Sequence, residues 1–231
     1  VMAVNNETGE RLPVEEMFAG VKQKNPDVLV HCDCVQGFGK ILFSLNRIKA
    51  DMVTMSSHKI HGPKGCGAIY VREGVNLRPL CFGGSQESRV RPGTENVPGI
   101  AAFGHASLKA LRDIRENWEH VKELNLYLRD CLQQMEDVVI NSPSGAVPYV
   151  LNISVLPFAT EDLLHEMRMR GIYLSGSSAC EKGARSHVIR AMGIDGPRAD
   201  SVVRIGLGKK NTREEVTVLV ETLNELIKRG K

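Results

Sequence analysis

Long apolar runs are missing from this 231-residue chain: no stretch reaches the roughly 20 apolar residues of a membrane-spanning helix, and no secretory signal pattern opens the sequence. Charge of one sign is not in excess either, since 30 basic and 27 acidic side chains leave a formal net charge of +3 without a long basic run. The charge therefore gives nucleic-acid binding no support. We expect a protein that neither spans a membrane nor binds nucleic acid directly.

A cysteine framework is also missing. The six cysteines are scattered, mostly in apolar or glycine-rich surroundings, unlike the disulfide staples of small secreted domains, so we expect a reducing, cytoplasmic setting. The segment His31-Cys32-Asp33-Cys34 could hold a metal, but strand alternation points His31 and Asp33 to one face and the cysteines to the other. Since no second Cys/His pair follows at ligand spacing, we expect no metal site.

Hydrophobic residues make up 42% of the chain and charged residues 25%, a balance that allows a sizeable core and two lobes. Apolar residues recur at helical spacing over residues 14–21, and a short helical turn is expected at 46–49. Short apolar runs at residues 28–32, 51–55 and 67–71 are predicted as strands, the first one buried and parallel. This rhythm predicts an α/β sheet, in which ligands bind beyond the strand ends.

The second half of the chain begins with a polar, glycine-rich loop over residues 78–98, which is long enough to indicate a functional loop. An alanine-rich helix opens at Pro98, and a long helix follows over residues 114–132. Residues 150–154 and 202–207 are predicted as strands.

Three helix starts are indicated by polar residues. Thr160 and Ser186 are expected to cap helices, and Thr212 with Glu215 forms a capping-box pattern that opens the last helix.

The tetrapeptide Ser56-Ser57-His58-Lys59 carries the clearest chemical signal. A lysine amine can form a Schiff base with an aldehyde cofactor, and the hydroxyls and imidazole beside it can hold a phosphate. Asp33, at the end of the preceding apolar run, can pair with a protonated pyridine nitrogen. Because these groups follow one another just past strand ends, together with Asn6 and Gln36, the pattern predicts a pyridoxal 5′-phosphate (PLP) site on one edge of the sheet.

Two further residues have chemical and structural interpretations. Cys180 lies among small residues, where a thiol can be an exposed nucleophile or simply a cysteine in a Ser/Gly loop; the upstream PLP pattern favours the nucleophile. Arg204 lies inside an apolar strand, where its charge needs a partner. It can form a structural ion pair at a strand edge or bind a substrate carboxylate, and both interpretations stay open.

These motifs together resemble one family. The chain is similar to the cysteine desulfurases, PLP enzymes of the class V aminotransferase fold, a family that also contains selenocysteine lyases. The matching segments run through the whole chain in family order: Val4-Asn5-Asn6-Glu7-Thr8-Gly9, His31-Cys32-Asp33-x-x-Gln36, Ser56-Ser57-His58-Lys59, Gly62-Pro63-Lys64-Gly65, Gly83-Gly84-x-Gln86-Glu87, Arg91-Pro92-Gly93-Thr94-Glu95-Asn96, Leu151-Asn152-Ile153-Ser154, Ser177-Ser178-Ala179-Cys180 and Val203-Arg204-Ile205-Gly206-Leu207-Gly208.

The resemblance assigns cofactor contacts to the first half of the chain. Lys59 would bond covalently to the cofactor aldehyde, and Asp33 would pair with the pyridine nitrogen. Gln36 would contact the ring and its phenolic oxygen, together with Asn6. Ser56 and His58 would bind the phosphate.

It also assigns substrate and partner contacts. Thr94 would reach the phosphate in the partner subunit, which implies a homodimer. Arg204 would bind the carboxylate of the substrate L-cysteine, with Asn6 beside it. Cys180 would take the substrate sulfur as a persulfide, leave L-alanine, and pass the sulfur to an acceptor protein of iron–sulfur assembly or tRNA thiolation.

Three alternatives remain open. A selenocysteine lyase would use the same cofactor on a different substrate. Another class V aminotransferase would have no use for a thiol at position 180. A fragment without catalytic activity would serve as a dimerisation or scaffold piece.

Family members carry a large N-terminal portion with a Gly/Ala-Thr phosphate-binding turn and a histidine that stacks on the cofactor. Neither is present here, so we expect the sequence to begin inside a domain and the isolated chain to be inactive. Residues 1–112 are expected to form the C-terminal part of the large PLP-binding α/β domain. Residues 113–231 are expected to form a small α+β domain that carries the catalytic cysteine loop.

Overall fold

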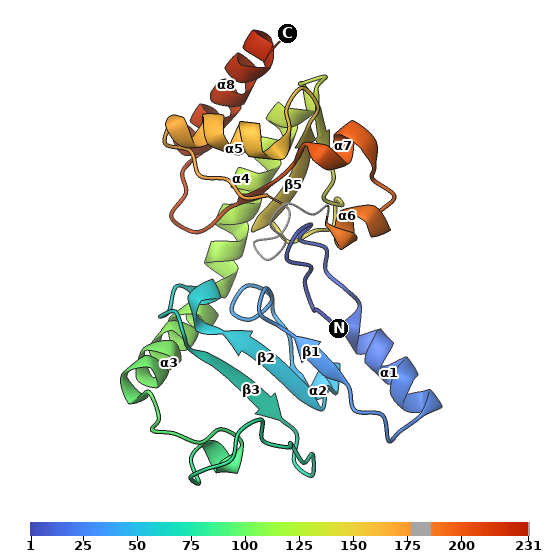
Figure 1. Cartoon of the computed structure of the whole chain (residues 1–231), viewed down its shortest axis with the longest axis vertical. Helices are drawn as coiled ribbons and strands as arrows, with labels where there is room; N and C mark the ends of the chain where they lie inside the picture. Colours follow the sequence, from blue (N-terminus) through green and yellow to red (C-terminus); the bar gives the residue numbers. More distant parts are fainter. Residues whose placement is uncertain (177–185, 231) are drawn as a thin grey trace. The chain divides into compact units, whose positions relative to one another are not determined.

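A computed structural model of the chain describes residues 1–176 and 186–230 (Figure 1). It divides into two compact units: Val1–Ala3 with Leu12–Ile114, and Val4–Arg11 with Arg115–Lys231. The elements in chain order are α1 (Val14–Lys24), β1 (His31–Asp33), α2 (Leu45–Ile48), β2 (Met52–Ser56), the 3-10 turn η1 (Ser57–Ile60), β3 (Gly67–Val71), the 3-10 turn η2 (Glu87–Arg89), α3 (Val97–Arg112), α4 (Ile114–Gln133), β4 (Val138–Ile140), β5 (Val150–Val155), α5 (Thr160–Met169), α6 (His187–Ala191), α7 (Gly196–Asp200), β6 (Val202–Gly206) and α8 (Arg213–Gly230).

The first unit contains a three-stranded sheet in the order β1-β2-β3, and it confirms the expected mixed α/β character. Strands β1 and β2 are parallel, with Asp33 opposite Thr54. Strand β3 is antiparallel to β2, with Ser56 opposite Gly67. The connection from β2 to β3 is short and holds only η1 and a turn, so β3 has to run back beside β2.

Strand β1 begins three residues later than the sequence predicted. The Val30 amide donates a hydrogen bond to Asp51 Oδ2 at 2.7 Å instead of pairing with a neighbouring strand. Val28 and Leu29 before it are exposed. An apolar run without a sheet partner is therefore a loop here, although its composition favours a strand.

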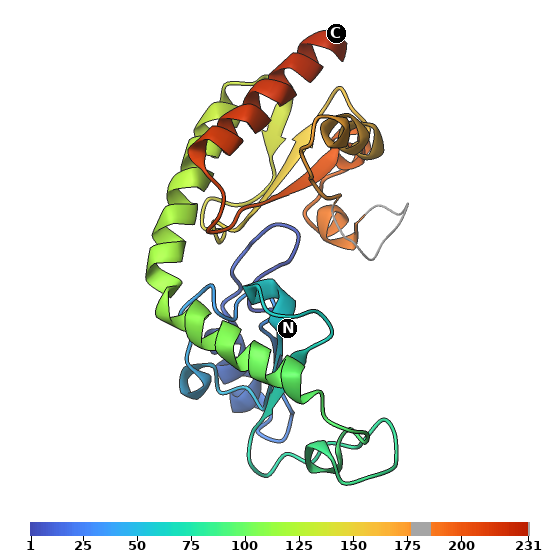
Figure 2. The ribbon, with the colours of Figure 1, turned by 90° about the vertical axis from the view of Figure 1, so that its left-hand side faces the viewer.

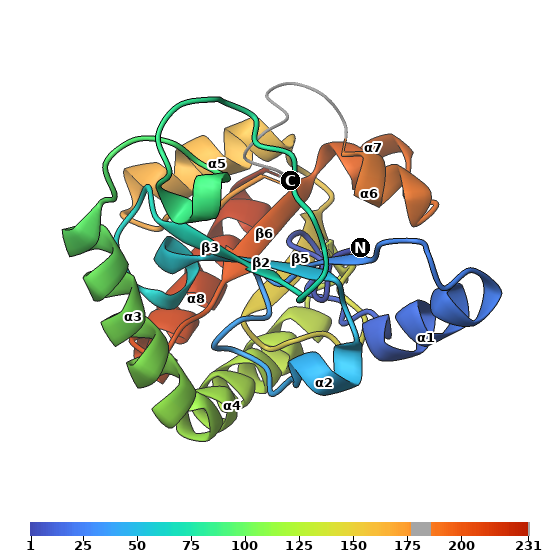
Figure 3. The same ribbon diagram turned by 90° about the horizontal axis from the view of Figure 1, so that it is seen from below.

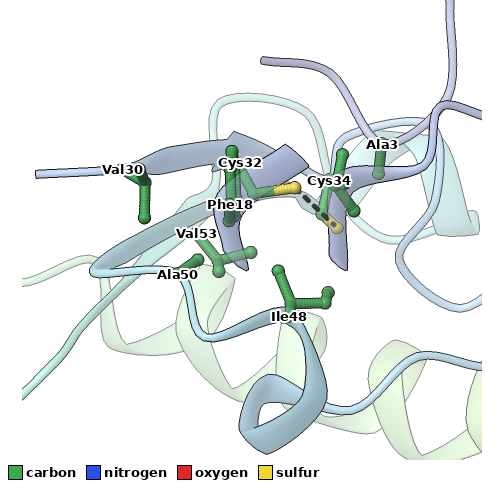
Figure 4. Packing of buried hydrophobic residues seen from close by; sticks show 9 residues of the cluster. Ala3, Phe18, Val30, Cys32, Cys34, Ile48, Ala50 and Val53 are labelled. Carbon is green, nitrogen blue, oxygen red and sulfur yellow. Dashed lines mark hydrogen bonds between the residues drawn. The ribbon is translucent and has the colours of Figure 1, made fainter. Parts of the chain in front are cut away.

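The core of the first unit lies against α1 and α2 (Figure 4). Phe18 from α1 and Ile48 from α2 pack with Val53 of β2 and with the two cysteines of the β1 region. Cys32 and Cys34 are fully buried, and their sulfur atoms lie 3.9 Å apart. The predicted alternation is confirmed on this side, because both cysteines face the core while His31 is exposed.

A second, smaller cluster joins α3 to the turn after β2. Phe103 and Ala110 of α3 pack with Ile60 of η1, and Phe38 meets Phe103 edge-on at a centroid distance of 6.1 Å. The helices α1 and α3 lie apart, with the β1–β3 sheet between them in both Figure 1 and Figure 3. Helix α3 therefore supports the turn that carries Lys59.

Asp51 ties three segments of the first unit together. Its side chain is fully buried and pairs with Lys22 Nζ at 2.8 Å and with Arg72 Nε at 2.8 Å. Burial alone would raise the pKa of the Asp51 carboxyl, but the hydrogen bonds from Lys22, the Val30 amide and Arg72 outweigh it and lower that pKa.

Replacing Asp51 with asparagine is expected to lower the free energy of unfolding by about 1–3 kcal/mol at pH 7, since two partly exposed cations lose a buried partner. A carboxyl whose folded-state pKa is lowered stabilises the fold above its ordinary pKa of about 4 and loses that contribution as the pH falls through the folded-state value. The difference between Asp51→Asn and wild type should therefore shrink in acid. Urea unfolding followed by circular dichroism at neutral and acidic pH measures this, and an equal difference at every pH would contradict it.

The second unit holds an antiparallel sheet in the order β4-β5-β6. Helices α4 and α8 cover one face of this sheet and α5 lies on the other (Figure 2). The hydroxyls of Tyr127 in α4 and Thr217 in α8 form a hydrogen bond at 3.0 Å, which links the two long helices. Strand β4 was not predicted from the sequence, because it is only three residues long and polar segments flank it on both sides.

Two of the three predicted helix starts are confirmed. Ser186 accepts hydrogen bonds from the amides of Val188 and Ile189 at the start of α6. Thr212 and Glu215 bond reciprocally through side chain and backbone before α8. The prediction for Thr160 is wrong: its hydroxyl donates instead to the carbonyl oxygen of Val202 at 2.8 Å, so it joins α5 to the start of β6.

In the part of the chain that is described, every helix is too short or too polar to cross a membrane.

Candidate active site

The carboxyl ends of β1 and β2 bring most of the predicted cofactor residues of the first unit to one edge of the sheet. The two strands are parallel, and Asp33 closes β1 while Ser56 closes β2. Gln36 follows β1 in a tight turn, and His58 and Lys59 follow β2 in η1. Ligands of α/β sheets bind at such an edge.

Lys59 lies in a turn that tolerates little change. Gly62 comes so close to Ser57 that a β-carbon at position 62 would collide with Ser57 Oγ. The Gly62 amide also donates to the Ser57 carbonyl at 3.0 Å. Lys59 itself is half-buried, and within the described residues its ammonium makes no hydrogen bond or ion pair. The backbone is therefore held in place while the amine stays available.

Asp33 and Gln36 each use only part of their hydrogen-bonding capacity. Asp33 Oδ1 accepts from the Val35 amide at 2.9 Å, and Gln36 Oε1 accepts from Lys40 Nζ at 2.9 Å. The second Asp33 oxygen and the Gln36 amide nitrogen have no partner among residues 1–176 and 186–230. An acceptor and a donor are thus left at the strand edge.

Ser56 and His58 form a pair that can hold an anion. Ser56 Oγ lies 2.7 Å from His58 Nδ1, and His58 is exposed. The next residue, Ser57, is fully buried, and its hydroxyl has no partner in the described structure. Sequence reasoning assigned Ser57 no role of its own, because nothing in a Ser-Ser pair shows which hydroxyl is buried.

Asn6 and Arg204 lie together in the second unit. Arg204 Nη1 donates to the Asn6 carbonyl oxygen at 2.9 Å. Burial lowers the pKa of Arg204, and the nearby negative charge of Glu7 opposes that shift. The guanidinium is half-buried, and its other nitrogens have no hydrogen bond in the described part of the chain. It can bind a carboxylate.

The remaining predicted residues are placed differently. Thr94 is exposed in the loop before α3, and its hydroxyl has no partner among the described residues. Cys180 lies outside the described residues. The other cysteines are all free thiols, so no disulfide forms within the described chain. No cluster of metal-ligating side chains occurs among the residues described.

A comparison with known families gives one decisive match. The model of the family described as Aminotransferase class-V matches residues 1–219. The chain belongs to the aminotransferase class-V family.

Individual relatives within this family are named cysteine desulfurases, which confirms the resemblance found in the sequence. The chain is 39% identical over 233 residues to the mitochondrial cysteine desulfurase of Saccharomyces cerevisiae, covering 99% of this chain and 46% of that protein. It is 38% identical to a cysteine desulfurase of a Nostoc species, covering 99% of this chain and 58% of that protein. The chain therefore spans about half the length of the curated relatives it matches.

Solved structures of NifS-like proteins share the fold of this chain. A NifS-like protein superimposes with a TM-score of 0.91 at 38% identity, covering 98% of this chain and 60% of that one. A NifS-like protein from Rickettsia africae superimposes with a TM-score of 0.88 at 31% identity, covering 97% of this chain and 60% of that chain.

The residues of the first unit fit PLP, the cofactor that the family implies. The free amine of Lys59 matches the aldehyde, and the unpaired oxygen of Asp33 matches a protonated ring nitrogen. The Ser56–His58 pair and the orphaned hydroxyl of Ser57 supply polar groups for a phosphate.

Proposed function

We propose that the protein is a PLP-dependent cysteine desulfurase, which converts L-cysteine to L-alanine and leaves a persulfide on Cys180. The observation that carries this proposal is the placement of Asp33 and the Lys59 turn on one edge of a parallel strand pair, in a chain whose relatives are named cysteine desulfurases. The same chain supplies a thiol at position 180 and a half-buried arginine that can bind a carboxylate.

The residues of the first unit hold the cofactor and move protons. When bound, PLP stores the electron pair that is set free at the substrate carbon. The Lys59 amine would hold the cofactor through its aldehyde and, once free, would accept the proton from the substrate Cα. Asp33 would keep the ring nitrogen protonated, and Gln36 would donate to the phenolic oxygen. From the second unit, Asn6 would contact the same oxygen, as the family resemblance implies. Ser56 and His58 bind the phosphate.

The residues of the second unit handle the substrate. Arg204 binds the carboxylate of L-cysteine, and its bond to the Asn6 carbonyl orients the guanidinium. The Cys180 thiolate attacks the substrate sulfur, so a sulfur–sulfur bond forms as the substrate carbon–sulfur bond breaks. The electron pair of that bond stays with the carbon, which is protonated to give alanine. Atoms and electrons balance without an external oxidant.

The persulfide sulfur would be transferred to another protein. We propose an acceptor of iron–sulfur assembly or of tRNA thiolation, in the cytoplasm, with no direct contact to nucleic acid or membrane. A thiol that carries transferable sulfur has to meet the acceptor directly. The two-domain division at residues 1–112 and 113–231 would place Cys180 on the α+β domain that follows residue 112.

A homodimer is also proposed. The first unit exposes a group of large apolar side chains on the loop and helix around Thr94, among them Leu80 at 99% and Phe82 at 90% exposure, with Val97 and Ile100. Exposed large apolar side chains of this kind support an interface with a second copy of the chain. In such a dimer Thr94 would bind the phosphate in the partner subunit.

Mixing inactive Lys59→Ala and Thr94→Ala homodimers under conditions of subunit exchange is expected to restore activity. A mixed dimer holds one site in which an intact Lys59 meets an intact Thr94 from the other chain. Alanine formation is measured before and after exchange, and native mass spectrometry confirms that mixed dimers have formed. No recovery in demonstrated mixed dimers would contradict the shared site.

The function itself is tested by alanine formation from L-cysteine in the PLP-loaded, full-length protein, with mass spectrometry of Cys180 for the extra sulfur. Parallel turnover of L-selenocysteine discriminates a selenocysteine lyase. Transamination without sulfur on Cys180 would favour another class V aminotransferase. A protein that binds PLP without turnover of either substrate would favour the non-catalytic alternative.

A further inference from the structure

The stretch of sequence that carries Cys180 is attached at both ends to one polar cluster of the second unit. Before it, Ser175 pairs with Arg204 of β6: the Arg204 amide donates to the Ser175 carbonyl at 2.7 Å, and the Ser175 amide donates back at 3.2 Å. After it, Ser186 Oγ donates to Glu7 Oε2 at 2.7 Å. Arg204 and Glu7 are in turn joined through Asn6, whose carbonyl binds the Arg204 guanidinium.

Glu7 is a buried carboxylate, with 2% of its surface exposed, in a turn that is fixed on several sides. Asn5 Oδ1 accepts from the Glu7 amide at 2.9 Å, and Asn152 Nδ2 donates to the Glu7 carbonyl at 3.3 Å. Ser142 Oγ donates to the Thr8 carbonyl at 2.6 Å. The backbone that carries the carboxylate is therefore held against β5 and the segment before it.

Ser186 uses its whole hydrogen-bonding capacity at this point. Its oxygen accepts from the amides of Val188 at 3.1 Å and Ile189 at 3.3 Å, and its single hydrogen goes to Glu7. Ser186 is 3% exposed, so water competes little for the bond. A hydrogen bond to a buried carboxylate is among the stronger ones in proteins. Glu7 thereby holds the residue from which α6 starts.

We propose that Glu7 is a positioning residue for sulfur transfer: by holding Ser186, it fixes the point at which the Cys180-bearing stretch rejoins the fold, in the same cluster that holds Arg204. The inference rests on the proposed function. It explains why a carboxylate is buried beside the residue that binds the substrate. The part of Glu7 in sulfur transfer runs through Ser186, so loss of the bond to Ser186 should slow delivery of the Cys180 sulfur more than it weakens cysteine binding.

The hydrogen bond between Ser186 and Glu7, called the tie below, is tested first in the full chain without cofactor. The test is a double-mutant cycle of Glu7→Ala and Ser186→Ala. The readout is hydrogen exchange of the Val188 and Ile189 amides. We expect each single variant to raise exchange by about tenfold or more, and the double variant to match Ser186→Ala, because a broken bond cannot be lost twice. The Ser186→Ala single variant and the double variant both lack the helix cap, so the cap makes no difference to the comparison between them.

Two further variants keep the test decisive. Ser186→Thr retains both donor and acceptor, although it adds a methyl group at a buried site, and should exchange much closer to wild type than Ser186→Ala does. Where Glu7→Ala fails to fold, Glu7→Gln keeps a neutral acceptor, and an intermediate rise of about threefold is expected from the weaker bond. Wild-type protection in the Glu7 variants, or an equal effect of Glu7→Ala with and without Ser186, would overturn the tie.

The consequence is tested in the PLP-loaded, full-length protein. Per cofactor-loaded site, kcat for alanine formation should fall about tenfold in Glu7→Ala and Ser186→Ala. In Ser186→Ala, which leaves the charge of Glu7 beside Arg204, the KM for cysteine should stay within about twofold of wild type. Glu10→Ala, an exposed glutamate of the same segment, is the matched control. A purely structural role would lower the loaded fraction but leave kcat per loaded site unchanged, and that result would overturn the proposal. A wild-type protein that forms no alanine would refute the proposed function, while the exchange cycle would still decide the tie.

Discussion

Replacing Lys59 with alanine is expected to abolish both the visible absorbance that PLP acquires on the protein and alanine formation, by at least about a thousandfold. Alanine has no amine to bond with the aldehyde or to take the Cα proton. No hydrogen bond or ion pair engages the Lys59 ammonium in the described chain, so the loss of folding stability should be small. Absorbance spectra during PLP titration and a steady-state assay of alanine measure the two effects.

Lys64→Ala is the matched control for this prediction. Lys64 is exposed and lies beyond the Gly62-Pro63 turn, so it should leave absorbance and turnover unchanged. Borohydride reduction followed by peptide mass spectrometry identifies the lysine that carries the cofactor. A reduced cofactor adduct that survives in Lys59→Ala would show that another lysine does this work.

Changing Cys180 to serine is expected to spare PLP binding and to remove alanine formation by at least about a thousandfold, the scale on which turnover falls when a covalent nucleophile is lost. A hydroxyl is far too weakly acidic to replace a thiolate at neutral pH. Tryptic digestion isolates this cysteine, since the peptide of residues 171–182 contains no other. Mass spectrometry of that peptide after incubation with L-cysteine reports the persulfide directly.

Cys81→Ser is the control, because Cys81 is an exposed thiol in the other unit. It should retain full turnover and a normal persulfide on the 171–182 peptide. Undiminished alanine release by Cys180→Ser would remove Cys180 from the mechanism. Loss of PLP absorbance in that variant would instead point to a defect of folding.

Local signals predicted most of the elements. The helical spacing of apolar residues placed α1 and α4, and the reciprocal Thr212–Glu215 pair marked the start of α8. Strand β3 has the predicted bounds, and β5 extends one residue beyond them. These features depend on residues a few positions apart, so the chain carries them without reference to its fold.

The predictions of secondary structure were wrong where a residue far away in the sequence takes up a hydrogen-bonding group of the segment. The Val30 amide turns to Asp51 rather than to a strand, which shortens β1. The Thr160 hydroxyl reaches the carbonyl of Val202, 42 residues away, instead of capping α5. Propensity describes what a segment favours alone, and a buried partner from elsewhere overrides it.

The sequence by itself determined the chemistry: an amine at Lys59, a carboxylate at Asp33, a thiol at Cys180 and a guanidinium at Arg204, in the order of one family. Parallel pairing of β1 and β2 then decided that Asp33 and the Lys59 turn share an edge. Only the tertiary structure joined Asn6 to Arg204 and buried Glu7 against Ser186, residues 179 positions apart. The physical reason is that burial of a polar group depends on what packs around it after folding, and no pattern of neighbours along the chain records that.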